Sequence, residues 1–63
     1  MTELKETIDA LLNMRHNIHI LMDDSKKIRA NGKFFAYKKC YIMLSGIIHP
    51  LNEKLPDIDR RSI

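Results

Sequence analysis

The chain has 63 residues, a formal net charge of +3 and one cysteine, Cys40. This length allows one domain at most, and a single cysteine excludes a disulfide within the chain. A monomer of this size buries only about 60% of the surface that its unfolded chain exposes, so its stability is marginal. Because no complete metal-binding motif appears, we expect self-association to supply the missing burial.

Charged residues interrupt every stretch that could act as a signal or a membrane span. Glu3, Glu6 and Asp9 break the first twenty residues, where a secretory signal would need an apolar core. The most apolar run, residues 40–51, is far shorter than the roughly 20 residues that cross a bilayer. We therefore expect a soluble, cytoplasmic protein that makes no membrane contact.

The charges are distributed unevenly along the chain. Residues 1–24 hold five acidic and two basic residues, whereas residues 25–39 hold six basic residues and no acidic one. Acidic and basic residues balance in residues 40–63, with three of each. A basic block of this kind forms a patch, and charged patches attract partners of opposite charge.

The first helix is expected from about residue 3 to about residue 30. Its apolar residues recur at spacings of three, four and seven, and they include Leu4, Ile8, Leu11, Ile18 and Met22. A neighbouring row holds Met14, Leu21 and Ile28. This is the pattern of a helix with one broad buried face. At ~1.5 Å per residue the helix would be about 40 Å long, and it needs a partner helix along most of its length.

The strongest turn signal in the chain is Asn31-Gly32. Both residues tolerate positive φ, so they could end the first helix and begin a tight reversal. The same pair is also common in β-hairpins. The flanking segments repeat at helical spacing and do not alternate, which favours a helical hairpin with its turn at residues 31–32.

The second helix is expected from about residue 33 to about residue 54, with a kink near Pro50. Its apolar residues form a continuous seam at spacings of three and four: Phe34, Tyr37, Tyr41, Leu44, Ile48, Leu51 and Leu55. A second apolar row, Ala36, Cys40, Met43 and Ile47, runs beside that seam. A helix so widely apolar packs against more than one neighbour. The hairpin would thus comprise residues 1–55, followed by a flexible tail at 56–63.

Two such hairpins could supply each other's neighbours. We therefore predict an all-α fold, a two-helix antiparallel hairpin that dimerises into a four-helix bundle. The predicted dimer interface consists of Tyr41, Leu44, Ile48 and Leu51. In length and helix count the chain resembles the Rop class of plasmid regulators, in which paired helical hairpins form a four-helix bundle that binds RNA. The resemblance covers architecture alone and carries no residue across.

Several residues could suggest chemistry, but none forms a complete site. His16, His19 and Asp23 lie at metal-ligand spacings on one helix, yet the sequence offers no further ligand to close a tetrahedral site. Cys40 has apolar neighbours in the helical pattern, so we expect a buried structural thiol and not an activated nucleophile. We predict no catalytic, cofactor-binding or metal-binding residue and no enzymatic activity.

The basic segment is the best candidate for a functional surface. The predicted partner-binding residues are Lys26, Lys27, Arg29, Lys33, Phe35, Lys38 and Lys39. We expect a small regulatory or inhibitory protein that binds a macromolecule, with a protein partner favoured, such as a phage or mobile-element modulator of host machinery. The alternative is an RNA- or DNA-binding regulator that uses the basic–aromatic segment 26–39, with lysines on phosphates and Phe35 or Tyr37 stacked on bases.

Overall fold

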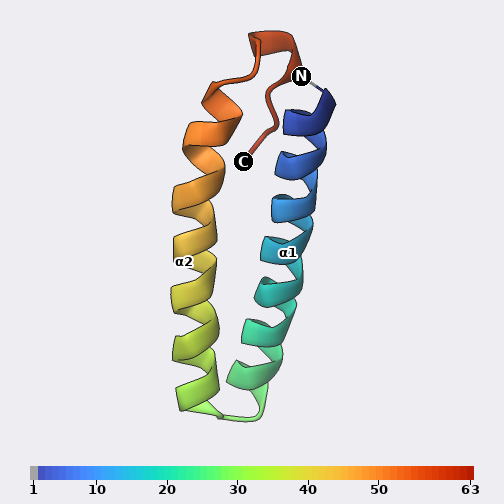
Figure 1. Ribbon diagram of the computed structural model, residues 1–63. Helices are drawn as coiled ribbons and strands as arrows, with labels where there is room; N and C mark the ends of the chain where they lie inside the picture. The colour runs from blue at the N-terminus through green and yellow to red at the C-terminus, as the bar shows by residue number, and fades with distance from the viewer. Residues whose placement is uncertain (1) are drawn as a thin grey trace.

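The computed structural model describes residues 2–63 and contains two long helices that pack side by side. Helix α1 spans Thr2–Lys27, helix α2 spans Asn31–Glu53, and a 3-10 turn, η1, spans Asp57–Asp59. The helices run antiparallel, with both chain ends at one end of a rod of 41 × 16 × 15 Å (Figure 1). The predicted all-α helical hairpin is confirmed.

The apolar seam of α2 faces α1. All seven seam residues predicted from the sequence, from Phe34 to Leu55, are half-buried or buried. Ile8 on α1 and Ile48 and Leu55 on the opposing segment are buried to 1% exposure or less, and they form the fully buried core of the described residues. A two-helix layer has only one internal face, which is why so few side chains lose all contact with solvent.

The turn between the helices differs from the sequence-based prediction. Asn31 and Gly32 are the first residues of α2, and the reversal occurs at residues 28–30. Arg29 has the positive φ, 58°. Its amide N–H donates to the carbonyl of Lys26, and that of Ala30 donates to the carbonyl of Ser25 at 2.8 Å.

This pair of bonds is a Schellman ending, a motif that usually has glycine where Arg29 lies. A left-handed conformation costs a non-glycine residue about 1–2 kcal/mol. The helix–helix packing that the earlier turn permits outweighs that cost.

Helix α2 continues through Pro50 to Glu53. The proline ring would collide with the carbonyl of residue 46 in a straight helix. That residue is Gly46, which lies on the exposed side of the helix with open space where a side chain would project. The end of α2 is thus close to the predicted one, and Asn52 and Leu55 beyond the proline are buried.

The C-terminal segment 56–63 also differs from the flexible tail that we predicted. It folds back over the open end of the hairpin (Figure 1), where Arg61 connects to both helices. The Arg61 guanidinium donates two hydrogen bonds to the Asp9 carboxylate, at 2.7 and 3.0 Å. The backbone N–H and C=O of Arg61 pair with the buried Asn52 side chain at 2.8 and 3.0 Å. No hydrophobic periodicity marks these polar contacts, which explains why the sequence pattern missed them.

The contact between Asp9 and Arg61 predicts a pH-dependent stability. Hydrogen bonds from Arg61 hold the pKa of Asp9 below its ordinary value of 3.8, and the nearby charges of Arg61 and Lys5 act in the same direction. A carboxylate with a lowered folded-state pKa stabilises the fold at neutral pH, and that stabilisation disappears as the pH falls from its unfolded-state pKa through its folded-state pKa.

We expect the melting temperature of the native chain to exceed that of Asp9→Asn at neutral pH, with the difference closing in acid below the ordinary carboxylate range. Thermal unfolding followed by circular dichroism measures this difference. Asp24→Asn is the control, because Asp24 is exposed and makes no ion pair within residues 2–63. A difference that persists unchanged in acid would contradict the assignment.

Candidate functional site

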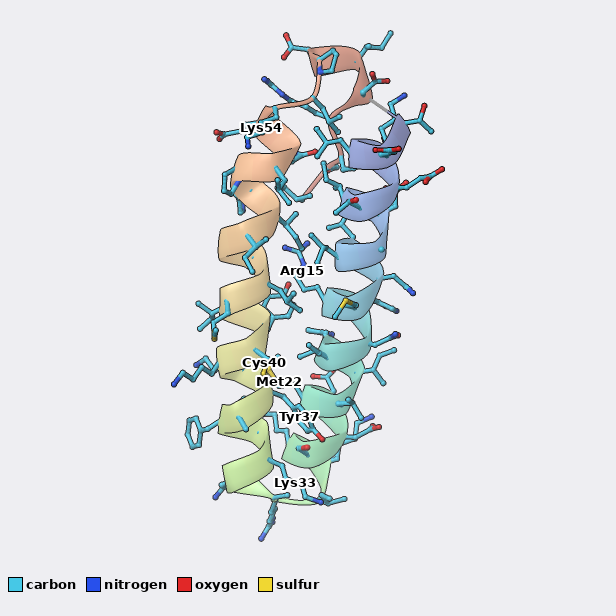
Figure 2. The ribbon with its side chains drawn as sticks, viewed as in Figure 1. Arg15, Met22, Lys33, Tyr37, Cys40 and Lys54 are labelled. Carbon is cyan, nitrogen blue, oxygen red and sulfur yellow. The ribbon has the colours of Figure 1, made fainter. Side chains whose placement is uncertain are left out.

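The predicted basic residues gather at the turn end of the hairpin. Lys26 and Lys27 are in the last turn of α1, and Arg29 is in the connection. Lys33 is in the first turn of α2, where Figure 2 labels it. Lys38 and Lys39 follow one to two turns along α2. All six side chains are exposed. Lys26 and Lys27 also lie where the negative end of the α1 dipole favours cations, so part of their role is to stabilise the helix.

The two ends of the rod differ in how many ion pairs they form. Four ion pairs occur within residues 2–63, and three of them tie the tail to itself or to α1: Lys5–Asp59, Arg60–Asp57 and Arg61–Asp9. The fourth joins His19 to Asp23 at 3.8 Å. None of these four pairs involves a cation of the turn end. Three of the four ion pairs therefore lie at the terminal end, and the turn end presents its cations to solvent.

An aromatic side chain stands beside these cations. Phe35 is 64% exposed, and its ring packs edge-on against Phe34 with 5.6 Å between the ring centroids. Phe34 is half-buried in the seam, so Phe35 packs against a side chain that the helix–helix contact holds in place. Sequence reasoning placed Phe35 at the surface and Phe34 in the seam, and the burial of both residues agrees with that prediction. We define the six cations and Phe35 as the basic turn end.

The four residues predicted as a dimer interface lie in the seam within one chain. Ile48 is fully buried against α1, and Tyr41, Leu44 and Leu51 are half-buried. Ile48 therefore has no exposed surface left for a second chain. The half-buried Leu44 and apolar residues outside the seam remain accessible.

Those other residues form a groove on one face of the hairpin. The groove has a volume of about 280 Å³ and is lined by Met14 and Ile18 from α1 and by Cys40, Met43, Leu44 and Ile47 from α2. Cys40 is exposed at this groove, so our prediction of a buried thiol is wrong. The error arose because the second apolar row of α2 lies beside the seam and not within it.

The opposite face carries a smaller, polar cleft. Its volume is about 240 Å³, and Leu12, Arg15, His16, His19 and Tyr41 line it. Arg15 lies between the two helices (Figure 2). Its guanidinium stacks 5.3 Å from the centre of the Tyr41 ring and donates a hydrogen bond to the Ser45 hydroxyl at 3.1 Å. These contacts join α1 to α2 and give Arg15 a structural role.

Within residues 2–63, no group of three or more His, Cys, Asp or Glu side chains is arranged to hold a metal ion. No helix in the same range is long and apolar enough to cross a membrane. Comparisons of the chain with protein-family models, curated proteins and solved structures gave no match. Any functional assignment therefore depends on the surfaces described above.

Proposed function

We propose that this protein is a non-enzymatic regulator that binds an acidic surface of another protein through the basic turn end. The observation that supports the proposal most strongly is the contrast in ion pairing between the two ends of the rod. Six cations that make no ion pair within residues 2–63, next to a phenylalanine that is 64% exposed, form a surface suited to a partner with carboxylates around an apolar pocket.

The chemistry of the two cavities favours binding over catalysis. The larger groove is lined by apolar side chains, and the polar groups Arg15 and Tyr41 of the smaller cleft stack on each other. Arg15 also donates to Ser45. Groups engaged in this way hold the helices together. We therefore assign the function to the exterior of the rod and predict no reaction.

The proposed working form is a homodimer, an antiparallel four-helix bundle of two hairpins. The small core supports this proposal, because three fully buried hydrophobic side chains among the described residues are few for a stable monomer. Two copies would also present two basic turn ends, and two binding events on one assembly raise the apparent affinity for a partner with repeated acidic sites.

A nucleic-acid ligand is the second candidate, and the exposure of Phe35 is the observation that favours it. Lysines neutralise phosphates, and an exposed aromatic ring can stack on an unpaired base for about 1–3 kcal/mol. This candidate predicts binding that weakens steeply as salt rises. An acidic protein partner with an apolar pocket predicts a weaker dependence on salt, since part of its binding comes from Phe35.

Charge reversal at the turn end tests the proposal. We expect the triple variant Lys26→Glu, Lys27→Glu and Lys33→Glu to capture at least about tenfold less partner than the native chain. The introduced carboxylates would repel the acidic surface that the lysines attract. The measurement is affinity capture on the immobilised protein from a nuclease-treated lysate of the source cells, followed by quantitative mass spectrometry. Lys54→Glu is the control, because Lys54 is exposed at the opposite end of α2 (Figure 2).

Equal capture by the native chain and the triple variant would contradict a role for the basic turn end. Capture that disappears from the native chain after nuclease treatment would replace the protein partner with nucleic acid. In that case, fluorescence anisotropy with a labelled single-stranded oligonucleotide at two salt concentrations would measure the affinity directly.

A further inference from the structure

A continuous apolar face remains exposed along one side of the hairpin. We define it as Met14 and Leu21 on α1 and Cys40, Met43 and Ile47 on α2. Met14, Leu21, Met43 and Ile47 are 51, 45, 59 and 50% exposed, and the groove of about 280 Å³ runs between the two helices at this face. Half-exposed side chains of this size on both helices leave a large apolar surface in water.

The rod exposes more surface than a compact protein of its mass. Its accessible surface is 4768 Å² for 7.4 kDa, whereas the usual scaling gives about 4200 Å². Its radius of gyration is 13.5 Å, against about 10.6 Å for a compact chain of this length. The excess of roughly 560 Å² approaches the ~800 Å² that each partner buries in a stable interface of standard size. Docking one further chain would thus remove the excess.

The chain's own tail does not cover this face. Arg61 holds the tail to Asp9 and to the buried Asn52 at the terminal end, and no tail residue lines the groove. The groove lies midway along the rod, since Met14 and Ile18 are near the centre of α1 and Cys40 to Ile47 lie around the centre of α2. A central patch on a rod can be covered fully by an identical rod turned end for end.

We propose that this apolar face docks a second copy of the chain in antiparallel orientation, with the two turn ends at opposite ends of the dimer. This inference rests on the homodimer of the proposed function and adds its surface and its geometry. The two-fold axis passes through the middle of the groove, so that each copy presents the same residues to the other.

The distribution of charge selects this orientation. The turn half, residues 16–45, has six basic and two acidic residues, whereas residues 2–15 and 46–63 together have five basic and six acidic residues. An antiparallel pair places each positive turn half beside the slightly negative terminal half of the other copy. A parallel pair would place two positive halves together, where they repel. The antiparallel dimer also leaves both basic turn ends open to a partner.

Matched substitutions on α2 test the face. Light scattering at tens of micromolar is expected to give twice the 7.4 kDa mass of one chain for the native protein. Met43→Glu is expected to raise the dissociation constant at least about tenfold, because a charge would be buried in an apolar interface. Ile42→Glu is the control. Ile42 is as exposed as Met43, at 60% against 59%, but it points to a different side of α2 and does not line the groove. This variant should leave the dimer intact.

A monomeric mass for the native chain, or equal dissociation of both variants, would overturn the proposal. A monomeric Met43→Glu chain that captures as much partner as the native chain would separate the two proposals. It would confirm the face, remove the homodimer as the working form and leave the basic turn end as the binding surface. A native dimer that Met43→Glu dissociates but that captures no partner would confirm the face and refute the proposed function.

Spin labels near the start of α2 test the orientation, with the label itself placed away from the face. Gly32→Cys places the label where an added Cβ meets no atom within 4 Å, and Cys40→Ala removes the native thiol. Double electron–electron resonance on this variant is expected to give a distance between the two spin labels of the dimer near the 41 Å length of the rod. A separation of about 10–20 Å, one or two interhelical spacings, would mean a parallel dimer and overturn the proposed geometry.

Discussion

Replacing Ile48 with alanine is expected to lower the free energy of unfolding by about 2–5 kcal/mol, the usual cost of truncating a buried isoleucine. Ile48 is fully buried and belongs to a core of three such side chains in residues 2–63. A chain of this length has a total stability of only about 3–9 kcal/mol at typical values per residue. The variant should therefore lose a large share of its stability, as followed by circular dichroism during urea or thermal denaturation.

Ile42→Ala is the matched control for this substitution. It removes the same atoms from the same helix, but Ile42 is 60% exposed. Its expected effect is about 0.5 kcal/mol or less. Both variants must be compared at one protein concentration, because self-association makes the apparent stability concentration-dependent. Equal losses in the two variants would show that the seam between α1 and α2 does not carry the fold.

The second large effect is expected at Asn52, the buried amide that holds the tail. Asn52→Leu keeps a similar volume. It removes the amide N–H that donates to the Arg61 carbonyl and the amide oxygen that accepts from the Arg61 N–H. Leaving such groups unpaired costs about 1–3 kcal/mol. We expect that loss of stability together with release of residues 56–63. Hydrogen exchange should show that the Arg61 amide loses its protection while amides in the middle of α1 keep theirs.

Two further variants define the role of the Asn52 amide. Asn52→Asp keeps an acceptor for the Arg61 N–H but places a buried carboxylate oxygen against the Arg61 carbonyl, so we expect a loss of stability at least as large as with leucine. Asn17→Leu changes an exposed asparagine on α1 and should be nearly neutral. If the Arg61 amide stays protected in Asn52→Leu, the other contacts of the tail, such as Arg61 with Asp9 and Lys5 with Asp59, hold it in place, and the assignment to Asn52 is incorrect.

The sequence by itself was enough to predict both helices and the seam between them. Hydrophobic spacing identified the residues that face α1, from Phe34 in α2 to Leu55 just beyond it, because apolar periodicity reports directly which side of a helix loses water. It also placed Phe35 on the outside, next to the lysines of the turn. These features depend on local spacing, so they required no knowledge of which distant residues come together.

The turn and the tail required the tertiary structure. Asn31-Gly32 is the stronger local turn signal, yet the chain reverses at Arg29, because packing of the two helices selects the position of the turn. Arg61 reaches Asp9 across 52 positions of sequence, and no hydrophobic pattern marks a polar contact of that range. Local propensities are worth about a kilocalorie per mole, and tertiary contacts of several residues exceed them.

The same distinction applies to the candidate surfaces. The distribution of charge along the sequence located the cations of the basic turn end. Only the structure shows that the ion pairs of the described residues lie elsewhere. The sequence predicted more apolar surface than one hairpin can bury, and the structure shows which part of it stays exposed. Tertiary packing decided that Ile48 faces α1 and that Met43 and Ile47 face outward, because one helix can turn only one side to its neighbour.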